Sequence, residues 1–314
     1  MASKRVFMLL FCIALFSTAP AAVQDPPAPS GSGRLLEIHA VAVDGRGNPV
    51  ADLRPQDVEV WIAGVRVPLE SLGVPAARTE GPGRLIVLML DDITLDPTMV
   101  ARAREAANRF VEKMAPGDRM GVAMLNSGGL EITSSAAQAR SLIDRFRQSI
   151  GALPVDRLGE DFLNRLAAAA GAVVEAPEPR KIVVGIGSAW LLNTPVPTGE
   201  VGAIDIREEW FAAMRALGNA RAPYYMIDPI GVGVSRQTPS YGLAREAGGY
   251  AFVNTNDLNG AVDKILREAD NYYVIRVGDP PFGRKAVVRE LEVRSLRRDV
   301  TIRAPRGIPG GGGQ

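Results

Sequence analysis

The sequence predicts a three-layer, Rossmann-like α/β domain flanked by a small β-sandwich. Short apolar segments rich in β-branched residues alternate with amphipathic segments across residues 83–270, which is the pattern of a largely parallel sheet covered by helices. Residues 34–75 and 271–306 contain only strand-like segments. Neither group has enough strands for a stable core of its own, so we expect them to pair with each other in the sandwich.

The first residues predict export. Lys4 and Arg5 precede an apolar run over residues 6–16 and a small-residue stretch, the pattern of a cleaved signal peptide. The only cysteine, Cys12, lies in this segment, so we expect a mature chain without disulfides, secreted or periplasmic and without membrane insertion. The expected terminal segments are a signal peptide over residues 1–21, a flexible leader over 22–33 and a Gly-rich tail over 307–314.

The charge balance argues against nucleic acid as a partner. The chain has 36 basic and 35 acidic side chains, and removal of Lys4 and Arg5 leaves 34 basic against 35 acidic. The two signs are interspersed, so the basic stripe on which nucleic-acid binding depends is missing from the sequence. We expect another protein as the partner.

The expected strands of the sandwich come from both ends of the chain. Residues 35–43 predict a strand, and residues 58–62 and 65–69 predict a hairpin around Ala63-Gly64. Near the other end, alternation places Leu291 and Val293 on one face of a strand. The expected C-terminal strands cover residues 272–277, 286–294 and 300–304.

The expected α/β domain begins with a continuous apolar run at residues 85–90, typical of a strand buried on both faces. Asp96 is a suitable N-cap for the next helix, and Pro97 suits its first position. Residues 120–125 and 130–133 are close enough in sequence to permit only a hairpin, which predicts an antiparallel strand at a sheet edge. Further strands are expected at residues 182–186, 224–227 and 250–253.

Capping and stop signals predict where the other helices begin and end. Ser135 and Gln138 have the spacing of a capping box at the start of the second helix. We expect Phe211 on the inward face of the fourth helix, Gly218 as its stop, and Asn256 as the N-cap of the last helix. Two more helices are expected around residues 162–173 and 239–247.

Several segments resemble the von Willebrand factor A family. A strand ending in acidic residues, then a helix, then a hairpin is similar to the start of its domain. "RKIVVGIG" at residues 180–187, "YYMIDPIGVG" at 224–233 and "LAREAGGYAFVNTNDLNGAV" at 243–262 resemble the VWFA-related proteins of Acidobacteria. Residues 41–72, "YYVIRV" and "RAPRG" extend this resemblance over nearly the whole chain after the signal peptide. It implies an A-type fold and secretion.

The functional centre of the wider family is a metal-ion-dependent adhesion site, an Asp-x-Ser-x-Ser loop joined by a threonine and an aspartate from later loops. It holds Mg²⁺, which prefers oxygen ligands and can accept one from an acidic side chain of the partner. In this chain Asp91 stands at the first position, but Ile93 and Leu95 replace both serines. Ser188 stands in place of the later aspartate, and residues 151–157 contain no threonine. The resemblance therefore implies a degenerate site.

We expect metal-independent protein binding at the carboxyl edge of the sheet, where open α/β sheets bind ligands. The expected role is that of an adhesion or scaffold module, without cofactor or catalysis. Tryptophan is common among interface anchors, and one follows the strand at residues 182–186. The expected partner-binding residues are Asp91, Asp92, Thr94, Ser188, Trp190 and Asp228.

Two alternatives stay open. The first is an Mg²⁺- or Mn²⁺-dependent adhesin that uses the weaker oxygen set of Asp91, Asp92 and Thr94. The second is an extracytoplasmic hydrolase with residues 188–201 as a lid. The only histidine, His39, is far in sequence from the α/β loops, and Gly-x-Ser-x-Gly does not occur, so convergent catalytic groups are not evident.

Each candidate residue also has a structural interpretation. The aspartates can form loops, and Asp228 suits a turn before Pro229. His39 is expected to be a packed or surface residue of its strand.

Overall fold

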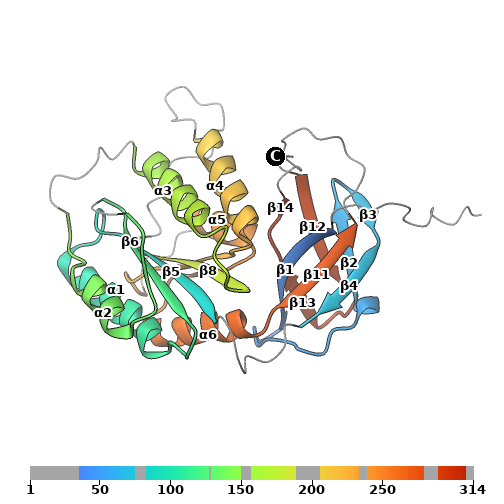
Figure 1. The fold of residues 1–314 in the computed structure, drawn as a ribbon, viewed down its shortest axis with the longest axis horizontal. Helices are drawn as coiled ribbons and strands as arrows, with labels where there is room; N and C mark the ends of the chain where they lie inside the picture. Colours follow the sequence, from blue (N-terminus) through green and yellow to red (C-terminus); the bar gives the residue numbers. More distant parts are fainter. Residues whose placement is uncertain are drawn as a thin grey trace, which may run out of the picture. The chain divides into compact units, whose positions relative to one another are not determined.

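The computed structural model describes residues 35–74, 83–126, 129–149, 157–188, 206–232, 239–278 and 289–308. In these segments the chain is a mixed α/β protein with one six-stranded and two four-stranded sheets (Figure 1). The predicted α/β class is confirmed. None of the described helices is long and apolar enough to cross a membrane. The expected signal peptide and leader lie outside the described residues.

The six-stranded sheet has the order β10-β9-β8-β5-β6-β7. Every neighbouring pair in it is parallel except β6 and β7, which confirms the predicted antiparallel strand at the edge. Every residue of β5 is buried, as the continuous apolar run predicts. The strands are β5 (Arg84–Leu90), β6 (Arg119–Met124), β7 (Glu131–Thr133), β8 (Arg180–Ile186), β9 (Tyr224–Ile227) and β10 (Ala251–Phe252).

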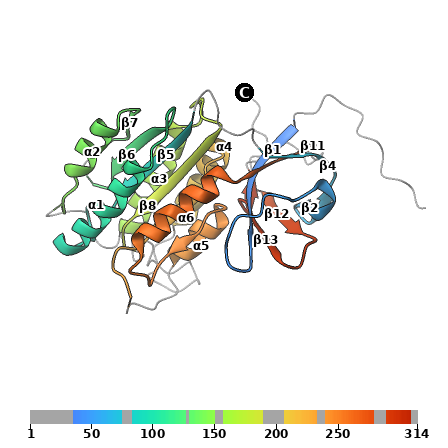
Figure 2. The same cartoon turned by 90° about the horizontal axis from the view of Figure 1, so that it is seen from below.

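Helices cover both faces of this sheet, as Figure 2 shows. Helices α1, α2 and α6 pack on one face and α3, α4 and α5 on the other, each set with its own hydrophobic core. Because side chains alternate along a strand, β5 gives Leu88 to the first core and Val87 to the second. The helices are α1 (Pro97–Glu112), α2 (Ala136–Asp144), α3 (Leu158–Ala172), α4 (Arg207–Ala220), α5 (Pro239–Glu246) and α6 (Leu258–Asp270).

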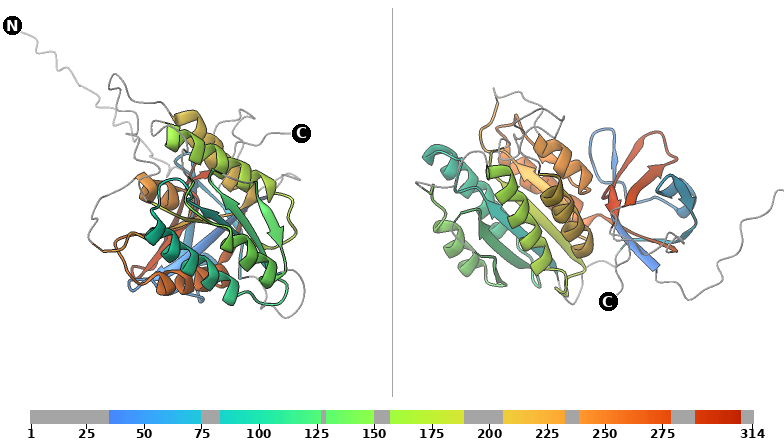
Figure 3. Two further views of the ribbon diagram at one scale, coloured as in Figure 1. Left: turned by 90° about the vertical axis from the view of Figure 1, so that its left-hand side faces the viewer. Right: turned by 90° about the horizontal axis from the view of Figure 1, so that it is seen from above.

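Strands from both ends of the chain build the two four-stranded sheets, where blue and red segments lie side by side in Figure 3. Their orders are β13-β1-β11-β4 and β14-β12-β2-β3. Buried residues from both sheets, including Ile38, Ile62 and Leu291, share one core. The elements are β1 (Leu35–Asp44), η1 (Pro55–Asp57), β2 (Val58–Ile62), β3 (Val65–Val67), β4 (Leu69–Gly73), β11 (Tyr273–Gly278), β12 (Arg289–Ser295), β13 (Val300–Arg303) and β14 (Gly307–Ile308).

Two predictions about these sheets are wrong. Residues 65–69 form two strands, because Pro68 has no N–H to donate to a ladder, and β3 and β4 belong to different sheets. The Gly-rich tail does not begin at residue 307, because β14 pairs with β12. The predicted turn is present, since Ala63 and Gly64 have φ of 49° and 77°, which suit a two-residue hairpin turn.

Three predictions about the helices are also wrong. The N-cap of α6 is Asp257, whose carboxylate accepts a backbone N–H of the first turn, and not Asn256. Helix α4 continues past Gly218 and ends where Arg221 adopts a left-handed φ of 52°. Phe211 is 50% exposed and not inward. The predicted cap at Asp96 is confirmed by its bond from a backbone N–H of α1.

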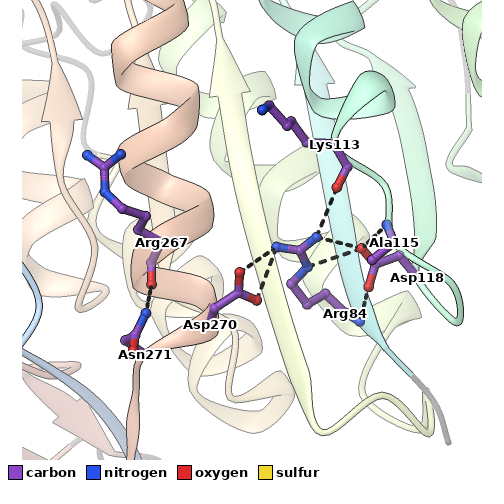
Figure 4. Close-up of polar contacts among 7 residues, drawn as sticks. All are labelled: Arg84, Lys113, Ala115, Asp118, Arg267, Asp270 and Asn271. Atoms are coloured by element: carbon purple, nitrogen blue, oxygen red, sulfur yellow. Dashed lines mark hydrogen bonds and ion pairs between the residues drawn. The ribbon is translucent and has the colours of Figure 1, made fainter. Parts of the chain in front are cut away.

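A buried cation fixes the amino end of β5. Nη2 of Arg84 donates to Asp118 Oδ2 at 2.6 Å, and Nη1 lies 3.2 Å from both carboxylate oxygens of Asp270 (Figure 4). Nη2 also lies 3.2 Å from the carbonyl oxygen of Lys113. Asp118 accepts the backbone N–H groups of Arg84 and Ala115 at 2.7 and 2.9 Å. Burial raises the pKa of Asp118, but these bonds outweigh it and the pKa lies below its ordinary value.

Candidate functional site

Four of the predicted site residues follow neighbouring parallel strands at the carboxyl edge of the central sheet. Asp91 and Asp92 come directly after β5, Ser188 lies just past β8, and Asp228 follows β9. Since β5, β8 and β9 are adjacent in the sheet, all four lie along one edge. Trp190 lies outside the described residues.

The carboxylate of Asp91 organises the loops at the centre of this edge. Its Oδ1 accepts the backbone N–H groups of Ile93 and Thr94 at 3.1 and 2.9 Å. Its Oδ2 accepts the N–H of Ser188 at 3.0 Å and the hydroxyl of Thr94. Gly187 is required beside it, because a Cβ there would overlap the Cβ of Asp91. The structure thus joins three of the predicted residues directly.

Burial dominates the electrostatics of Asp91. Asp91 is only 1% exposed. Burial raises the pKa of Asp91, although its four hydrogen bonds favour the charged form and oppose that rise. The carboxylate is therefore an internal acceptor for its own loops.

Asp92 holds a different pair of segments. Its Oδ1 accepts the N–H of Asn126, just after β6, at 2.7 Å, and its Oδ2 accepts the hydroxyl of Ser149, beyond α2, at 2.8 Å. The N–H of Ser149 also donates to the carbonyl oxygen of Asp92 at 2.6 Å. The two adjacent aspartates therefore serve different loops and do not form a carboxylate pair for acid/base chemistry.

The loop after β9 is held by Asp228, which the sequence suggested, and by Arg102, which it did not. Asp228 Oδ1 accepts the N–H of Ile230 at 2.9 Å, which is the turn-forming role. Arg102 of α1 donates from Nη1 to the carbonyl oxygen of Ile230 and from Nη2 to Asn256 Oδ1, at 3.2 and 3.3 Å. Asn256 Oδ1 also accepts the N–H of Val232 at 3.3 Å. No local sequence signal marks Arg102, because its partners lie more than a hundred positions away.

Most of the predicted contact residues are buried. Asp91, Asp92, Ser188 and Asp228 are 1%, 0%, 3% and 6% exposed. Direct contact between a partner and these side chains would require the atoms that cover them to move aside. Val232, at 65% exposed, is an apolar side chain that this edge presents to solvent.

The oxygens of this edge fit a divalent cation poorly. The described residues contain no group of three or more His, Cys, Asp or Glu side chains placed to hold a metal. From the described residues, each oxygen of Asp91 accepts two hydrogen bonds, and each oxygen of Asp92 accepts at least one. Because a carboxylate offers about four acceptor sites and those of Asp91 are all used, a cation bound by Asp91 would have to displace N–H or O–H donors that fix the loops.

His39 lies away from this edge, in β1, and its side chain is packed, at 7% exposed. Its Nε2 lies 3.2 Å from Glu37 Oε1, and its ring centroid is 5.1 Å from that of Tyr272. The hydrogen bond from His39, the charge of Arg221 and the hydrogen bond from Arg276 lower the pKa of Glu37 to about 2 against the effect of burial.

We expect the free energy of unfolding to fall between about pH 7.5 and about pH 5.5 because of His39. Burial lowers the pKa of His39 more than Glu37 raises it. The unfolded chain, with a histidine pKa of about 6.5, then binds the proton more readily, so stability present above that pH is lost below it. Urea unfolding across this range should show the slope in the wild type.

The control is His39→Gln. Because His39 is the only histidine, this variant should unfold with nearly the same free energy at both ends of the range. An equal slope in wild type and variant would contradict the assignment.

Comparison with known proteins adds little. No protein-family model and no curated protein sequence matches the chain. Among solved structures, a point mutant of the PilB minor pilin from Streptococcus sanguinis is similar over 61% of this chain, with a TM-score of 0.42 and 10% sequence identity. The match spans 63% of the pilin chain, less than two thirds of its length.

Proposed function

We propose that this chain is a secreted protein-binding module, of adhesion or scaffold type, built on a von Willebrand factor A-like domain with a degenerate metal site. The order of elements supports the A-like assignment: the central strand β5 ends in two aspartates, and α1 and the β6–β7 hairpin follow it. Secretion is inferred from the expected signal peptide at residues 1–21.

One observation carries the binding role. The acidic side chains at the carboxyl edge hold their own loops: from the described residues, Asp91 accepts four hydrogen bonds and Asp92 at least two. Using the carboxylate of Asp91 as a metal ligand or as a general base would break bonds that hold the edge together, because all four of its acceptor sites are used. Such an edge favours recognition through the surface of its loops, without a cation and without catalysis.

This proposal divides the predicted residues into two roles. Asp91, Asp92, Ser188 and Asp228 position the loops from inside, and Thr94 closes the first loop onto Asp91. The direct contacts come from exposed side chains such as Val232, together with Trp190 as the proposed aromatic anchor.

The test is affinity capture from an envelope extract of the producing organism, with the whole chain as bait. We expect the same partner in EDTA and in millimolar Mg²⁺. Val232→Asp should remove the partner, because it places a charge on an exposed apolar contact. Val65→Asp is the matched control, since Val65 is 50% exposed and lies on β3, in one of the two four-stranded sheets.

Two results would contradict the proposal. Capture in Mg²⁺ but not in EDTA would favour the metal-dependent adhesin. Equal capture by Val232→Asp and wild type would show that the carboxyl edge is not the contact surface.

A further inference from the structure

A cavity of about 540 Å³ lies beside the amino end of β10, on the opposite side of the sheet from the aspartates. Residues 301–303 of β13 line it consecutively, together with residues 249–251, which lead into β10. Side chains alternate between the faces of a strand, so three consecutive lining residues indicate that the cavity meets β13 along its edge. We call this space the arginine cavity, after the three arginines that line it: Arg245, Arg303 and Arg306.

The outer edges of β13 and β10 are both open in the described part of the chain. β13 pairs with β1 on one side and is the outermost strand of its sheet, and β10 pairs only with β9. An unpaired strand edge offers a row of backbone N–H and C=O groups to another extended segment. The volume of the arginine cavity lies within the range of about 300–1,000 Å³ that is common for ligand pockets.

The charges around the arginine cavity are not balanced. Among the described residues, the guanidinium groups of Arg245 and Arg306 have no hydrogen-bond or ion-pair partner, and Nε of Arg303 has no acceptor. Among the described lining residues Glu246 is the only acidic one, and it accepts the indole N–H of Trp210 at 3.1 Å. The cavity therefore presents free guanidinium donors to whatever enters it.

Further positive charge lies beneath the residues that line the arginine cavity. Arg303 forms an ion pair with Glu268, which is fully buried. Arg180 is 2% exposed, its guanidinium lies 4.4 Å from the Tyr272 ring, and within the described segments none of its guanidinium nitrogens has an acceptor. Buried Arg180 and half-buried Arg303 against one buried glutamate leave an excess of positive charge in a region of reduced dielectric, which favours an anion nearby.

We propose that the arginine cavity binds an acidic peptide in extended conformation, which adds as a strand to the free edge of β13 and sets its carboxylates against Arg245, Arg303 and Arg306. The planar guanidinium fork matches a carboxylate, and strand addition supplies main-chain hydrogen bonds. Ile302 and Tyr250, which is 40% exposed, line the cavity and receive the peptide's apolar side chains. This is a second recognition surface, independent of the carboxyl edge.

The probe is a capped hexapeptide of alternating glutamate and valine, titrated into the full chain by isothermal titration calorimetry. We expect binding that weakens about tenfold or more when glutamine replaces glutamate. We also expect binding to weaken from about 50 to about 300 mM salt, because exposed charge pairs are screened. A peptide N-methylated at alternate residues keeps its charges but loses the strand's hydrogen bonds, and at least one of its two registers should bind about tenfold less tightly.

The variants are Arg245→Gln and Arg306→Gln, because both side chains are exposed and neither supports the core. We expect the double variant to bind the glutamate peptide about tenfold less tightly, with an unchanged thermal midpoint. Arg140→Gln, also exposed but on α2, is the matched control. Arg303 is left intact because of its pair with the buried Glu268.

Four results would overturn the proposal. They are no binding of the glutamate peptide, equal binding by the double variant, equal binding of both N-methylated registers, and binding of citrate as tight as that of the peptide. Val232→Asp should bind the peptide like wild type, so a failure here is distinguishable from a failure of the proposed function.

Discussion

Replacing Arg84 by leucine is expected to lower the free energy of unfolding by about 3–5 kcal/mol, the cost of leaving a buried charge without its partner. The side chain of Asp118 is fully buried, and Arg84 is the cation that faces it in an ion pair. Leucine removes that cation and also the bonds to Asp270 and to the carbonyl of Lys113. Urea unfolding at pH 7 measures the loss.

Two controls separate charge from packing. Arg84→Leu combined with Asp118→Asn should recover part of the loss, because asparagine is neutral and still accepts a backbone N–H. Arg109→Leu removes a partly exposed arginine that pairs with Asp263 and Glu112, and it should have little effect. If Arg84→Leu costs no more than Arg109→Leu, the buried pair does not stabilise the fold as argued.

The ion pair of Arg84 and Asp118 also predicts how stability changes at acidic pH. The pKa of Asp118 is lowered in the folded chain. Its contribution to stability is therefore complete above the unfolded pKa of about 3.9 and is lost as pH falls through the lower folded pKa. Asp118→Asn should reduce the loss of stability that the wild type shows below about pH 4.

Asp91→Ala is expected to lower the free energy of unfolding by about 3 kcal/mol, and by the same amount in EDTA as in millimolar Mg²⁺. Alanine leaves the N–H groups of Ile93, Thr94 and Ser188 without their acceptor, and each hydrogen bond to a charged group contributes about 1.5–3 kcal/mol. The expected loss is smaller than the sum of these contributions, because water can hydrate the N–H groups of loops that are partly freed. Thermal and urea unfolding measure it.

Asp91→Asn tests whether both carboxylate oxygens are needed as acceptors. Its amide oxygen can still accept the N–H groups of Ile93 and Thr94, but its NH₂ cannot accept the N–H of Ser188, so an intermediate loss is expected. Asp96→Ala, which removes only an exposed helix cap, should cost about 1 kcal/mol. A rise of the wild-type midpoint with Mg²⁺ that disappears in Asp91→Ala would show that Asp91 holds a cation.

The sequence determined the features that depend on neighbours along the chain. The apolar run of β5, the cap at Asp96 and the β6–β7 hairpin all follow from side-chain periodicity, capping chemistry and connection length, which act over a few residues. The same logic placed Asp91, Asp92 and Asp228 at one edge, because parallel strands end together.

Only the tertiary structure decided what those residues contact. Asp91 and Asp92 are adjacent in sequence, yet they hold different loops, and Arg84 meets acids 34 and 186 positions away. Asn256 looks like a helix cap in the sequence but instead bonds to Arg102 and Val232. These pairings depend on the path of the whole chain, because a side chain's burial and partners are set by segments that local periodicity cannot bring together.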